Sequence, residues 1–236
     1  MIDPIENEIF LEKFKKTFYE SLKNIASKLN IENPILIVGK DCKRDSIWRN
    51  KIYPNYKSTR NNNNDFKGGP FFKLVYEDEM FIKGGVKDIL YHPHLEADDC
   101  IAISTKYILQ TYPSYNIYII TSDKDYLQLV EPRVQIYNLV YKNISQLKSS
   151  TNNSDCDLFC KIVMGDISDN ITSVFPKCGP KTALKYYNNK ELFNNKLQML
   201  NAYEKYNLNK TLIDFKEIPP ELIDEFIEQN HLYLLL

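Results

Sequence analysis

Long apolar runs and a secretion signal are both absent from this chain of 236 residues. A helix that spans a bilayer needs roughly 20 consecutive apolar residues, and no stretch of the chain approaches that length. The N-terminus MIDPIENEIF has neither the basic region nor the apolar region of a signal peptide. These absences exclude membrane-spanning and secreted proteins, so we expect a non-secreted protein of the cytoplasm or nucleus with no membrane partner.

Paired cysteine motifs and a zinc-binding set of histidines are also lacking. The five cysteines are an odd number, and none of them forms a C-x-x-C pair. Cys156 and Cys160 share a face of an expected helix, but a zinc site would need two further ligands. We therefore expect reduced thiols and no zinc, and we assign no chemistry to the three histidines.

The net charge of −1 hides two basic stretches and several acidic ones. Residues 40–73 contain nine Lys or Arg and three Asp or Glu, and residues 177–196 contain five and one. Much of the compensating negative charge lies in carboxylate motifs at 96–125 and 166–169. Basic stretches beside an acidic cluster are typical of a protein that binds a polyanion and a metal ion.

Hydrophobic patterning predicts alternating helices and strands in the first part of the chain. Apolar residues at steps of three and four predict an amphipathic helix over 5–29, and further helices are expected from Leu95 and from DKDYLQLV. Short apolar runs predict strands at 35–39, 115–121 and 133–140, the first of them buried on both faces. This alternation predicts an α/β fold with a mostly parallel sheet flanked by helices. Strand signals stop near residue 150, so we expect a core of residues 1–150 and a helical subdomain of residues 151–236.

Eight carboxylates lie in short motifs near the expected ends of strands and helices. Three crowd the start of a helix in LEADDC, where capping of the helix is the alternative explanation. Two follow a buried strand in YIITSDKDY, where ligands collect in α/β proteins, unless the motif is a solvated turn. Two more stand one helical turn apart in MGDISDN. With the acid after ILIVGK, the set is Asp41, Glu96, Asp98, Asp99, Asp123, Asp125, Asp166 and Asp169.

Carboxylates in such numbers would repel one another in a single cleft unless cations neutralised them. Hard oxygen ligands of this kind suit Mg²⁺ or Mn²⁺. The sequence therefore predicts a divalent metal centre built from carboxylates.

A basic and aromatic segment, DSIWRNKIYPNYKSTR, follows the first expected strand. Its cations can neutralise phosphates, and its aromatic rings can stack on unpaired bases. Lys57 and Arg60, three residues apart, could together steer one phosphate toward the metal ions. The alternative is an ordinary solvated face whose long side chains cover apolar surface.

A turn with Gly179 and Pro180 precedes a helix that opens with Lys181 and Thr182. The backbone N–H groups at such a helix N-terminus bind phosphate, and Lys181 and Lys185 add positive charge. A packing corner between two helices is the alternative explanation.

The order of the motifs EADD, SDKDYLQLV, GDISDN and GPKTA resembles that of the 5′-nuclease or flap endonuclease family, the 5′ to 3′ exonucleases. The segment NKTLIDFKEIPPELIDEFI is similar to the phage ribonuclease H branch, which favours a viral protein. The resemblance covers about residues 20–230. It implies a PIN-like core, a helical arch at about 47–90 and a helix-three-turn-helix at about 162–187.

The resemblance also implies roles for individual residues. Two Mg²⁺ ions, with Mn²⁺ as a substitute, would be held by Asp41, Glu96, Asp98 and Asp99 and by Asp123, Asp125, Asp166 and Asp169. Lys57 and Arg60 would be catalytic residues that contact the scissile phosphate. DNA would be bound by Arg49, Tyr56, Gly179, Lys181, Thr182 and Lys185, with Tyr56 stacked on the end base. Some members of the family hold K⁺ in the helix-three-turn-helix.

Two features depart from the family pattern. Members normally begin with an apolar strand that carries a metal-binding aspartate, and that first strand has no counterpart here. Asp3 makes a poor substitute, and we favour a sequence that starts at an internal methionine over true loss of the strand. In the DNA-binding turn, Lys177 replaces the first glycine of the family's hairpin.

The expected function is that of a Mg²⁺-dependent, structure-specific 5′-nuclease that removes RNA primers or 5′ flaps in DNA replication and repair. Its substrate would be a 5′ flap, a nicked or branched duplex, or an RNA–DNA primer junction. We expect a monomer that works with a replication protein. One alternative is a protein that binds branched DNA without cutting it, because the first metal aspartate is missing. The other is a PIN-type ribonuclease, against which the GPKTA turn argues.

Overall fold

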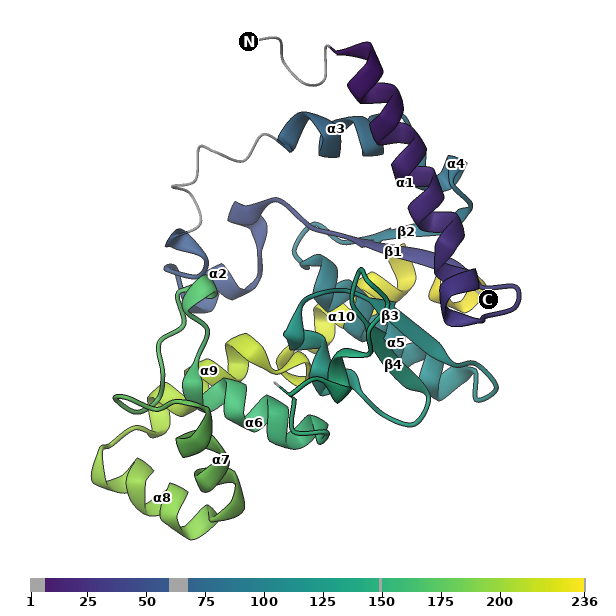
Figure 1. Cartoon of the computed structure of the whole chain (residues 1–236). Helices are drawn as coiled ribbons and strands as arrows, with labels where there is room; N and C mark the ends of the chain where they lie inside the picture. Colours follow the sequence, from purple (N-terminus) through teal and green to yellow (C-terminus); the bar gives the residue numbers. More distant parts are fainter. Residues whose placement is uncertain (1–6, 60–67, 149, 236) are drawn as a thin grey trace.

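The computed structural model describes residues 7–59, 68–148 and 150–235. Its strands form two parallel sheets of two strands each, surrounded by helices (Figure 1). The strands are β1 (Leu36–Lys40) paired with β2 (Val86–Tyr91), and β3 (Ile117–Ile120) paired with β4 (Val134–Tyr137). The predicted α/β fold with parallel strands is confirmed, although the described strands do not join into one sheet.

Helix α5 (Ala97–Thr111) packs on both sheets and carries much of the core. A Cβ added to Gly39 of β1 would lie 2.7 Å from the carbonyl oxygen of Ala97, so this close approach requires glycine. Ile37 of β1 and Ile117 of β3 pack on the same cluster of buried side chains, which α5 lines. The residues of β1 are nevertheless only half-buried, whereas the apolar run predicted burial on both faces. Among the described elements, α5 and β2 alone pack extensively on β1, which leaves part of the strand accessible.

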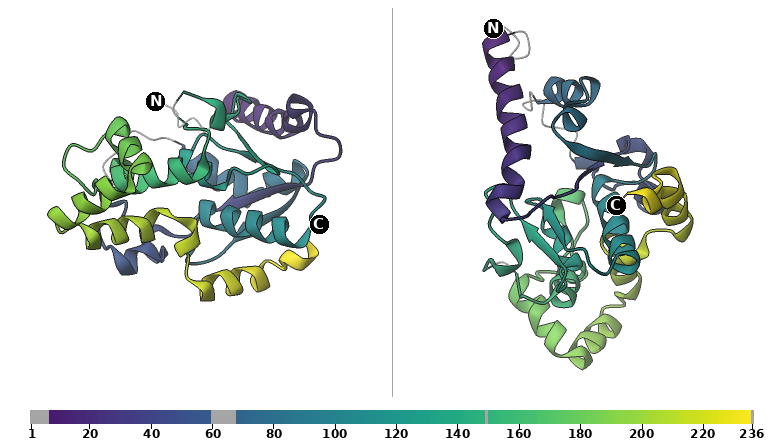
Figure 2. Two further views of the ribbon diagram at one scale, coloured as in Figure 1. Left: turned by 90° about the horizontal axis from the view of Figure 1, so that it is seen from below. Right: turned by 90° about the vertical axis from the view of Figure 1, so that its right-hand side faces the viewer.

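Helix α1 (Glu8–Leu29) confirms the predicted amphipathic helix but contains no buried residue. Its aromatic stripe packs on the helices α3 (Gly69–Glu77) and α4 (Met80–Lys83). The ring centroids of Phe14 and Phe71 are 4.8 Å apart, and those of Phe18 and Phe81 are 5.1 Å apart. The helix lies along one side of the molecule (Figure 2). The apolar stripe of this amphipathic helix therefore covers two short helices.

A group of helices follows residue 150, namely α6 (Ser154–Met164), α7 (Pro180–Asn188), α8 (Lys190–Met199) and α9 (Tyr203–Ile213). Phe175 and Phe193, with ring centroids 5.9 Å apart, lie in their shared core. The last helix, α10 (Pro220–Gln229), returns to α5, where Phe226 is fully buried (Figure 1). Residues 215–235 thus pack with the first part of the chain, and the division near residue 150 stays a prediction. Within the described ranges, no helix combines the length and the apolar character needed to cross a membrane.

Candidate metal centre

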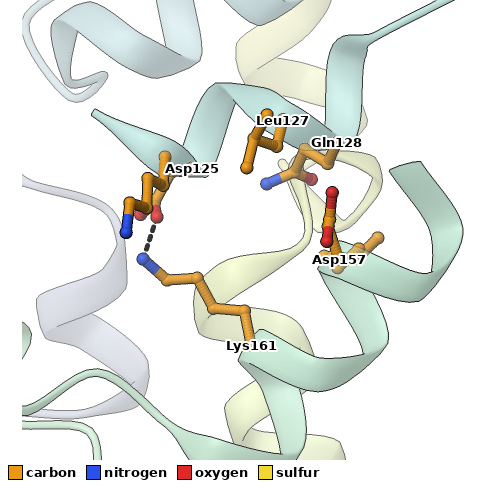
Figure 3. A pocket seen from close by; sticks show the side chains of 7 residues that line it. Asp125, Leu127, Gln128, Asp157 and Lys161 are labelled. Atoms are coloured by element: carbon orange, nitrogen blue, oxygen red, sulfur yellow. Dashed lines mark hydrogen bonds and ion pairs between the residues drawn. The ribbon is translucent and has the colours of Figure 1, made fainter. Parts of the chain in front are cut away.

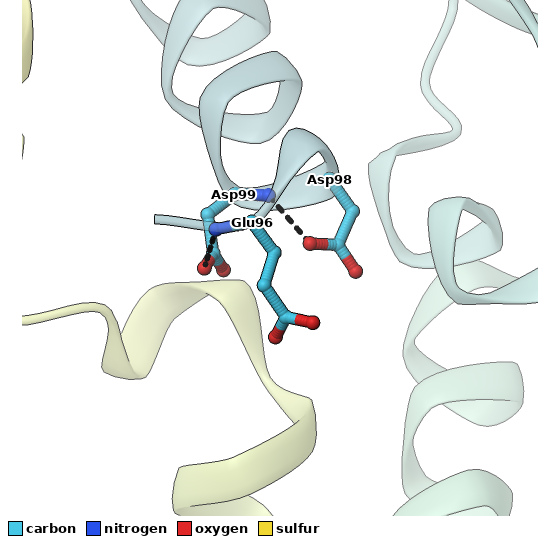
Figure 4. A group of neighbouring side chains, drawn as sticks. All are labelled: Glu96, Asp98 and Asp99. Carbon is cyan, nitrogen blue, oxygen red and sulfur yellow. Dashed lines mark hydrogen bonds between the residues drawn. The ribbon is translucent and has the colours of Figure 1, made fainter. Parts of the chain in front are cut away.

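The first carboxylate cluster lies at the N-terminus of α5 (Figure 4). Oxygen atoms of Glu96, Asp98 and Asp99 lie within 4.8 Å of one another. The backbone N–H of Glu96 donates to Asp99 at 3.2 Å, and the N–H of Asp99 donates to Asp98 at 2.8 Å. The capping explanation therefore accounts for part of the motif, because these side chains accept from N–H groups that a helix start leaves unpaired. The same side chains also bring their oxygens close enough to share a cation.

Basic and hydroxyl groups from the segment around the short helix α2 (Arg49–Ile52) compensate this cluster. Arg49 is only 2% exposed, and its guanidinium donates to Glu96 at 3.0 Å and to both oxygens of Asp99 at 2.7 Å. Lys57 pairs with Glu96, and the hydroxyl of Tyr56 lies 3.0 Å from the same carboxylate. Burial of several carboxylates is tolerated because these partners replace the water that they have lost.

The pKa values of Asp98 in the first cluster and of its neighbour Arg49 are both raised, which favours a neutral Asp98 and a charged Arg49. Burial, together with the carboxylates of Asp99 and Glu96, raises the pKa of Asp98 to about 8. Burial disfavours the charged form of Arg49, but the negative charge of Asp99 and the hydrogen bonds to it have the larger effect and raise the pKa of Arg49. The metal-free cluster therefore keeps a permanent buried cation and holds a proton on Asp98 at neutral pH.

The second carboxylate cluster comes from the 3₁₀ helix η3 (Lys124–Leu129), which follows β3, and from the turn after α6. Oxygen atoms of Asp125, Asp166 and Asp169 lie within 4.8 Å of one another. Lys161 of α6 pairs with Asp125 (Figure 3) and donates to Asp166 at 2.8 Å. Burial opposes ionisation of Asp166, but hydrogen bonds from Lys161 and the adjacent serine outweigh it and lower the pKa of Asp166 to about 2. Asp166 is therefore a carboxylate at every physiological pH.

Tyr56 and Lys57 connect the two clusters. The Tyr56 hydroxyl lies 3.0 Å from Glu96 and 3.3 Å from Asp169, and Nζ of Lys57 lies 3.7 Å from Asp169. The N–H of Lys57 also donates to the carbonyl oxygen of Asp169 at 3.0 Å. Lys57 has a φ of 53°, a left-handed conformation that costs energy in a residue other than glycine. Such a conformation, held in place by contacts to both clusters, is typical of a functional site.

Asp41 and Asp123 lie beside the clusters and are exposed. Asp41 accepts a hydrogen bond at 2.8 Å from the N–H of Ala97, which places it next to the first cluster. Asp123 caps η3 and accepts from the N–H of Asp125 at 2.9 Å, which places it next to the second. Each of the predicted carboxylates thus belongs to one of the clusters or contacts the backbone beside it.

Arg49 and Tyr56, which were predicted to bind DNA, are buried within the carboxylate centre, with 2% and 5% exposure. The prediction of an accessible basic and aromatic surface is corrected at these two positions. Their donors face acidic partners 40 or more residues away in sequence, which local spacing cannot indicate. Arg60 lies outside the described residues.

The predicted phosphate-binding turn leads into α7. Gly179 precedes the first turn of this helix, and Lys181, Thr182 and Lys185 are exposed on it. Lys177, which replaces a glycine of the family pattern, has a φ of 56° and so adopts the conformation that glycine reaches more easily. The start of α7 is therefore an accessible, basic helix N-terminus.

Two contributors to the centre were not assigned from the sequence. Lys161 shares α6 with a run of apolar residues, and its only signal is its position five residues before Asp166. Trp48 was noted as one aromatic residue among several, but its Nε1 donates to Asp99 at 3.0 Å. Both act through contacts that only the folded chain brings together.

The donor set of both clusters fits divalent cations such as Mg²⁺ or Mn²⁺. The grouped ligand atoms are all carboxylate oxygens, without thiol or imidazole. Each cluster also contains more carboxylates than the basic side chains that pair with it among the described residues. An excess of negative charge at this density favours the binding of cations.

The α/β fold and the two carboxylate clusters agree with one class of protein, the nucleases with a resolvase-like domain. The family model for the 5′-3′ exonuclease N-terminal, resolvase-like domain matches residues 13–156. The chain therefore belongs to the 5′-3′ exonuclease family, as the order of its motifs predicted.

Similar proteins come from bacteria and phages. A 5′-3′ exonuclease of Buchnera aphidicola is 31% identical over 83% of this chain and 69% of its own length. The ribonuclease H of Enterobacteria phage T4 is 26% identical over 98% of this chain and 81% of its own length. The crystal structure of the T5 D15 protein with metal ions superposes with a TM-score of 0.71 at 18% identity, over 94% of this chain and 92% of that one. This structural likeness confirms the fold.

Proposed function

We propose that the protein is a metal-dependent, structure-specific 5′-nuclease that hydrolyses phosphodiester bonds in RNA primers or 5′ flaps. The observation that carries the proposal is the arrangement of two carboxylate clusters that Tyr56 and Lys57 connect. Family membership supports the nuclease activity, and a related T5 flap endonuclease has been crystallised with DNA and metal ions.

Two Mg²⁺ ions, which Mn²⁺ could replace, would occupy the two clusters. The first would be held by Glu96 and Asp98 with Asp41 beside them, and the second by Asp123, Asp125, Asp166 and Asp169. Ions held by these carboxylates would lower the pKa of an attacking water and stabilise the leaving oxygen. No side-chain nucleophile is needed, and the products carry a 5′ phosphate and a 3′ hydroxyl.

Basic side chains of the chain would position the nucleic acid. Lys57 lies between the clusters and would contact the scissile phosphate together with Arg60. Lys181, Thr182 and Lys185 at the start of α7 would hold the duplex backbone, with K⁺ bound in the preceding turn. Because these contacts are to phosphates, binding should weaken steeply as salt is raised.

We further propose that the chain acts as a monomer beside a replication protein and that it is a viral protein. The phage ribonuclease H relative supports a viral origin, since it aligns over nearly the whole chain.

A second candidate is a protein that binds branched DNA without cutting it. It is favoured by the internal cations Arg49, Lys57 and Lys161, which already satisfy several of the carboxylates. If these pairs exclude divalent ions, recognition of the DNA would remain and hydrolysis would be lost.

The two candidates are separated by cleavage of a 5′-labelled flap duplex in Mg²⁺, with binding to the same duplex measured in Ca²⁺. We expect short labelled products in Mg²⁺ from the wild-type chain and from Asp224→Asn, an exposed carboxylate of α10 that serves as the control. Binding without cleavage would favour the second candidate, and the absence of binding would contradict both.

A further inference from the structure

Asp99 differs from its neighbours in the first cluster, because its two oxygens are already occupied by donors. Oδ2 accepts from Nε1 of Trp48 at 3.0 Å, from Nη1 of Arg49 at 2.7 Å and from the N–H of Glu96 at 3.2 Å. Oδ1 accepts from Nη2 of Arg49 at 2.7 Å. Three donors therefore crowd Oδ2, and one donor holds Oδ1, although a carboxylate oxygen offers only about two acceptor sites. Asp99 is also completely buried.

Asp98 shows the opposite arrangement. Its Oδ1 accepts from the N–H of Asp99 at 2.8 Å, and within the described part of the chain no hydrogen bond reaches its Oδ2. Its side chain is half-buried rather than enclosed. An ion could therefore bind Oδ2 of Asp98 without competing with a donor, whereas at Asp99 it would have to enter a fully buried site and share the oxygens that hold the Arg49 cation in a bidentate pair.

Arg49 connects this pair to the rest of the molecule. Its Nε donates to the carbonyl oxygen of Leu212 at the end of α9, 2.8 Å away, while Nη1 also reaches Glu96 at 3.0 Å. One planar guanidinium on α2 thus contacts both the start of α5 and the end of α9. Because Nη1 of Arg49 donates to both Asp99 and Glu96, the position of the Glu96 carboxylate depends on Arg49.

We propose that Asp99 is not a metal ligand but the buried counter-ion of Arg49, and that this pair positions Glu96 in the first metal site. The proposal rests on the metal centre of the proposed function. Arg49 and Asp99 are accordingly positioning residues, and the first ion is held by Glu96, Asp98 and Asp41.

The proposal is tested by titrating the full chain with Mn²⁺ and following the free ion by electron paramagnetic resonance. In an Arg49→Met background, the further change Asp99→Asn should alter Mn²⁺ affinity by less than about twofold, because the partner of Asp99 is already gone. In the same background Asp98→Asn should lower the affinity at least about tenfold, because a ligand is lost. Equal losses from Asp99→Asn and Asp98→Asn would overturn the proposal.

Two further variants keep the test decisive if Arg49→Met fails to fold. Arg49→Met/Asp99→Leu replaces both charges with apolar side chains, and we expect it to fold and to bind Mn²⁺ at least about tenfold more tightly than Asp98→Asn. It should still bind Mn²⁺ less tightly than the wild-type chain, because Glu96 loses the side chain that positions it. Trp48→Phe removes one donor from Asp99 and leaves the pair with Arg49, so Mn²⁺ affinity should stay unchanged. Tighter binding by Trp48→Phe would mean that the freed oxygen takes up the ion, which would overturn the proposal. Failure of the wild-type chain to bind Mn²⁺ would instead contradict the metal centre itself.

Discussion

The two carboxylate clusters of this protein contain similar acids but are neutralised in different ways. In the first cluster the main counter-ion is Arg49, which is buried and pairs in a bidentate fork with Asp99. In the second it is Lys161, whose side chain is 22% exposed and ends in a single ammonium group. A rigid buried pair is part of the fold, whereas an accessible lysine can move aside for another cation. We infer that folding alone fixes the arrangement of the carboxylates in the first cluster. In the second cluster, the arrangement depends on the ion that binds there.

The largest expected effect is on catalysis at the second cluster. Asp125→Asn keeps the shape of the side chain but removes a charge that an ion would need, so cleavage of a labelled flap should fall by about 10⁴-fold. Flap binding in Ca²⁺ should change by less than about threefold, since DNA is held mainly by basic groups elsewhere. Cleavage that survives the substitution would remove Asp125 from the metal centre.

The next largest effect concerns stability and separates the two counter-ions. Arg49→Met leaves the buried Asp99 without its cation, and we expect the free energy of unfolding in urea to fall by about 3–5 kcal/mol. Lys161→Met in the more accessible cluster should cost less, about 1–2 kcal/mol, because its partly exposed carboxylate partners can still be hydrated. Equal losses for the two variants would contradict the distinction between a structural and an exchangeable cation.

Lys57 contacts both clusters, and its substitution tests whether this side chain takes part in the reaction. Lys57→Ala should lower the single-turnover rate by about 100-fold, equivalent to about 2.7 kcal/mol, because the scissile phosphate loses its cation. Affinity for duplex DNA should fall only a few-fold. Lys181→Ala at the start of α7 is the matched comparison, and it should weaken DNA binding with little change in rate at saturating enzyme. An equal loss of rate and affinity for Lys57→Ala would reduce its role to general attraction.

The smallest expected effect is on stability. As pH rises, the free energy of unfolding should change with opposite signs at the two clusters. The raised pKa of Asp98 means that the metal-free protein loses stability as pH rises from about 4 to about 8, so Asp98→Asn should stabilise it at pH 7 by about 1–2 kcal/mol. The lowered pKa of Asp166 has the opposite consequence: its contribution is present above pH 4 and is lost as pH falls toward about 2.

Asp166→Asn should therefore destabilise the metal-free protein at pH 7 by about 1–2 kcal/mol, and the effect should vanish near pH 2. Thermal unfolding of both variants in the presence of a chelator, from about pH 2 to about pH 8, measures the sign of each change in stability. The same sign for both variants would mean that the clusters do not differ in their electrostatic environment.

Local patterns predicted much of the fold and missed what depends on distant contacts. The strand predicted at ILIVG and the helix predicted from Leu95 appear as β1 and α5 within one or two residues. Strand β2 was not predicted, because VKDILY mixes charged and apolar residues and its pairing partner lies 50 residues away. The helix expected at DKDYLQLV is a 3₁₀ helix, since Asp123 caps a tight turn there.

The sequence by itself indicated which carboxylates lie in or beside the two clusters, because each motif is short and its spacing follows from a helix start, a strand end or a tight turn. It also determined the family, since the order of the motifs is a property of the chain alone. The tertiary structure decided which partners those carboxylates meet. Arg49 and Tyr56 look like surface residues in the sequence, yet packing against α5 and α9 turns them inward. Burial and pairing are set by contacts across long stretches of chain, and no local pattern records them.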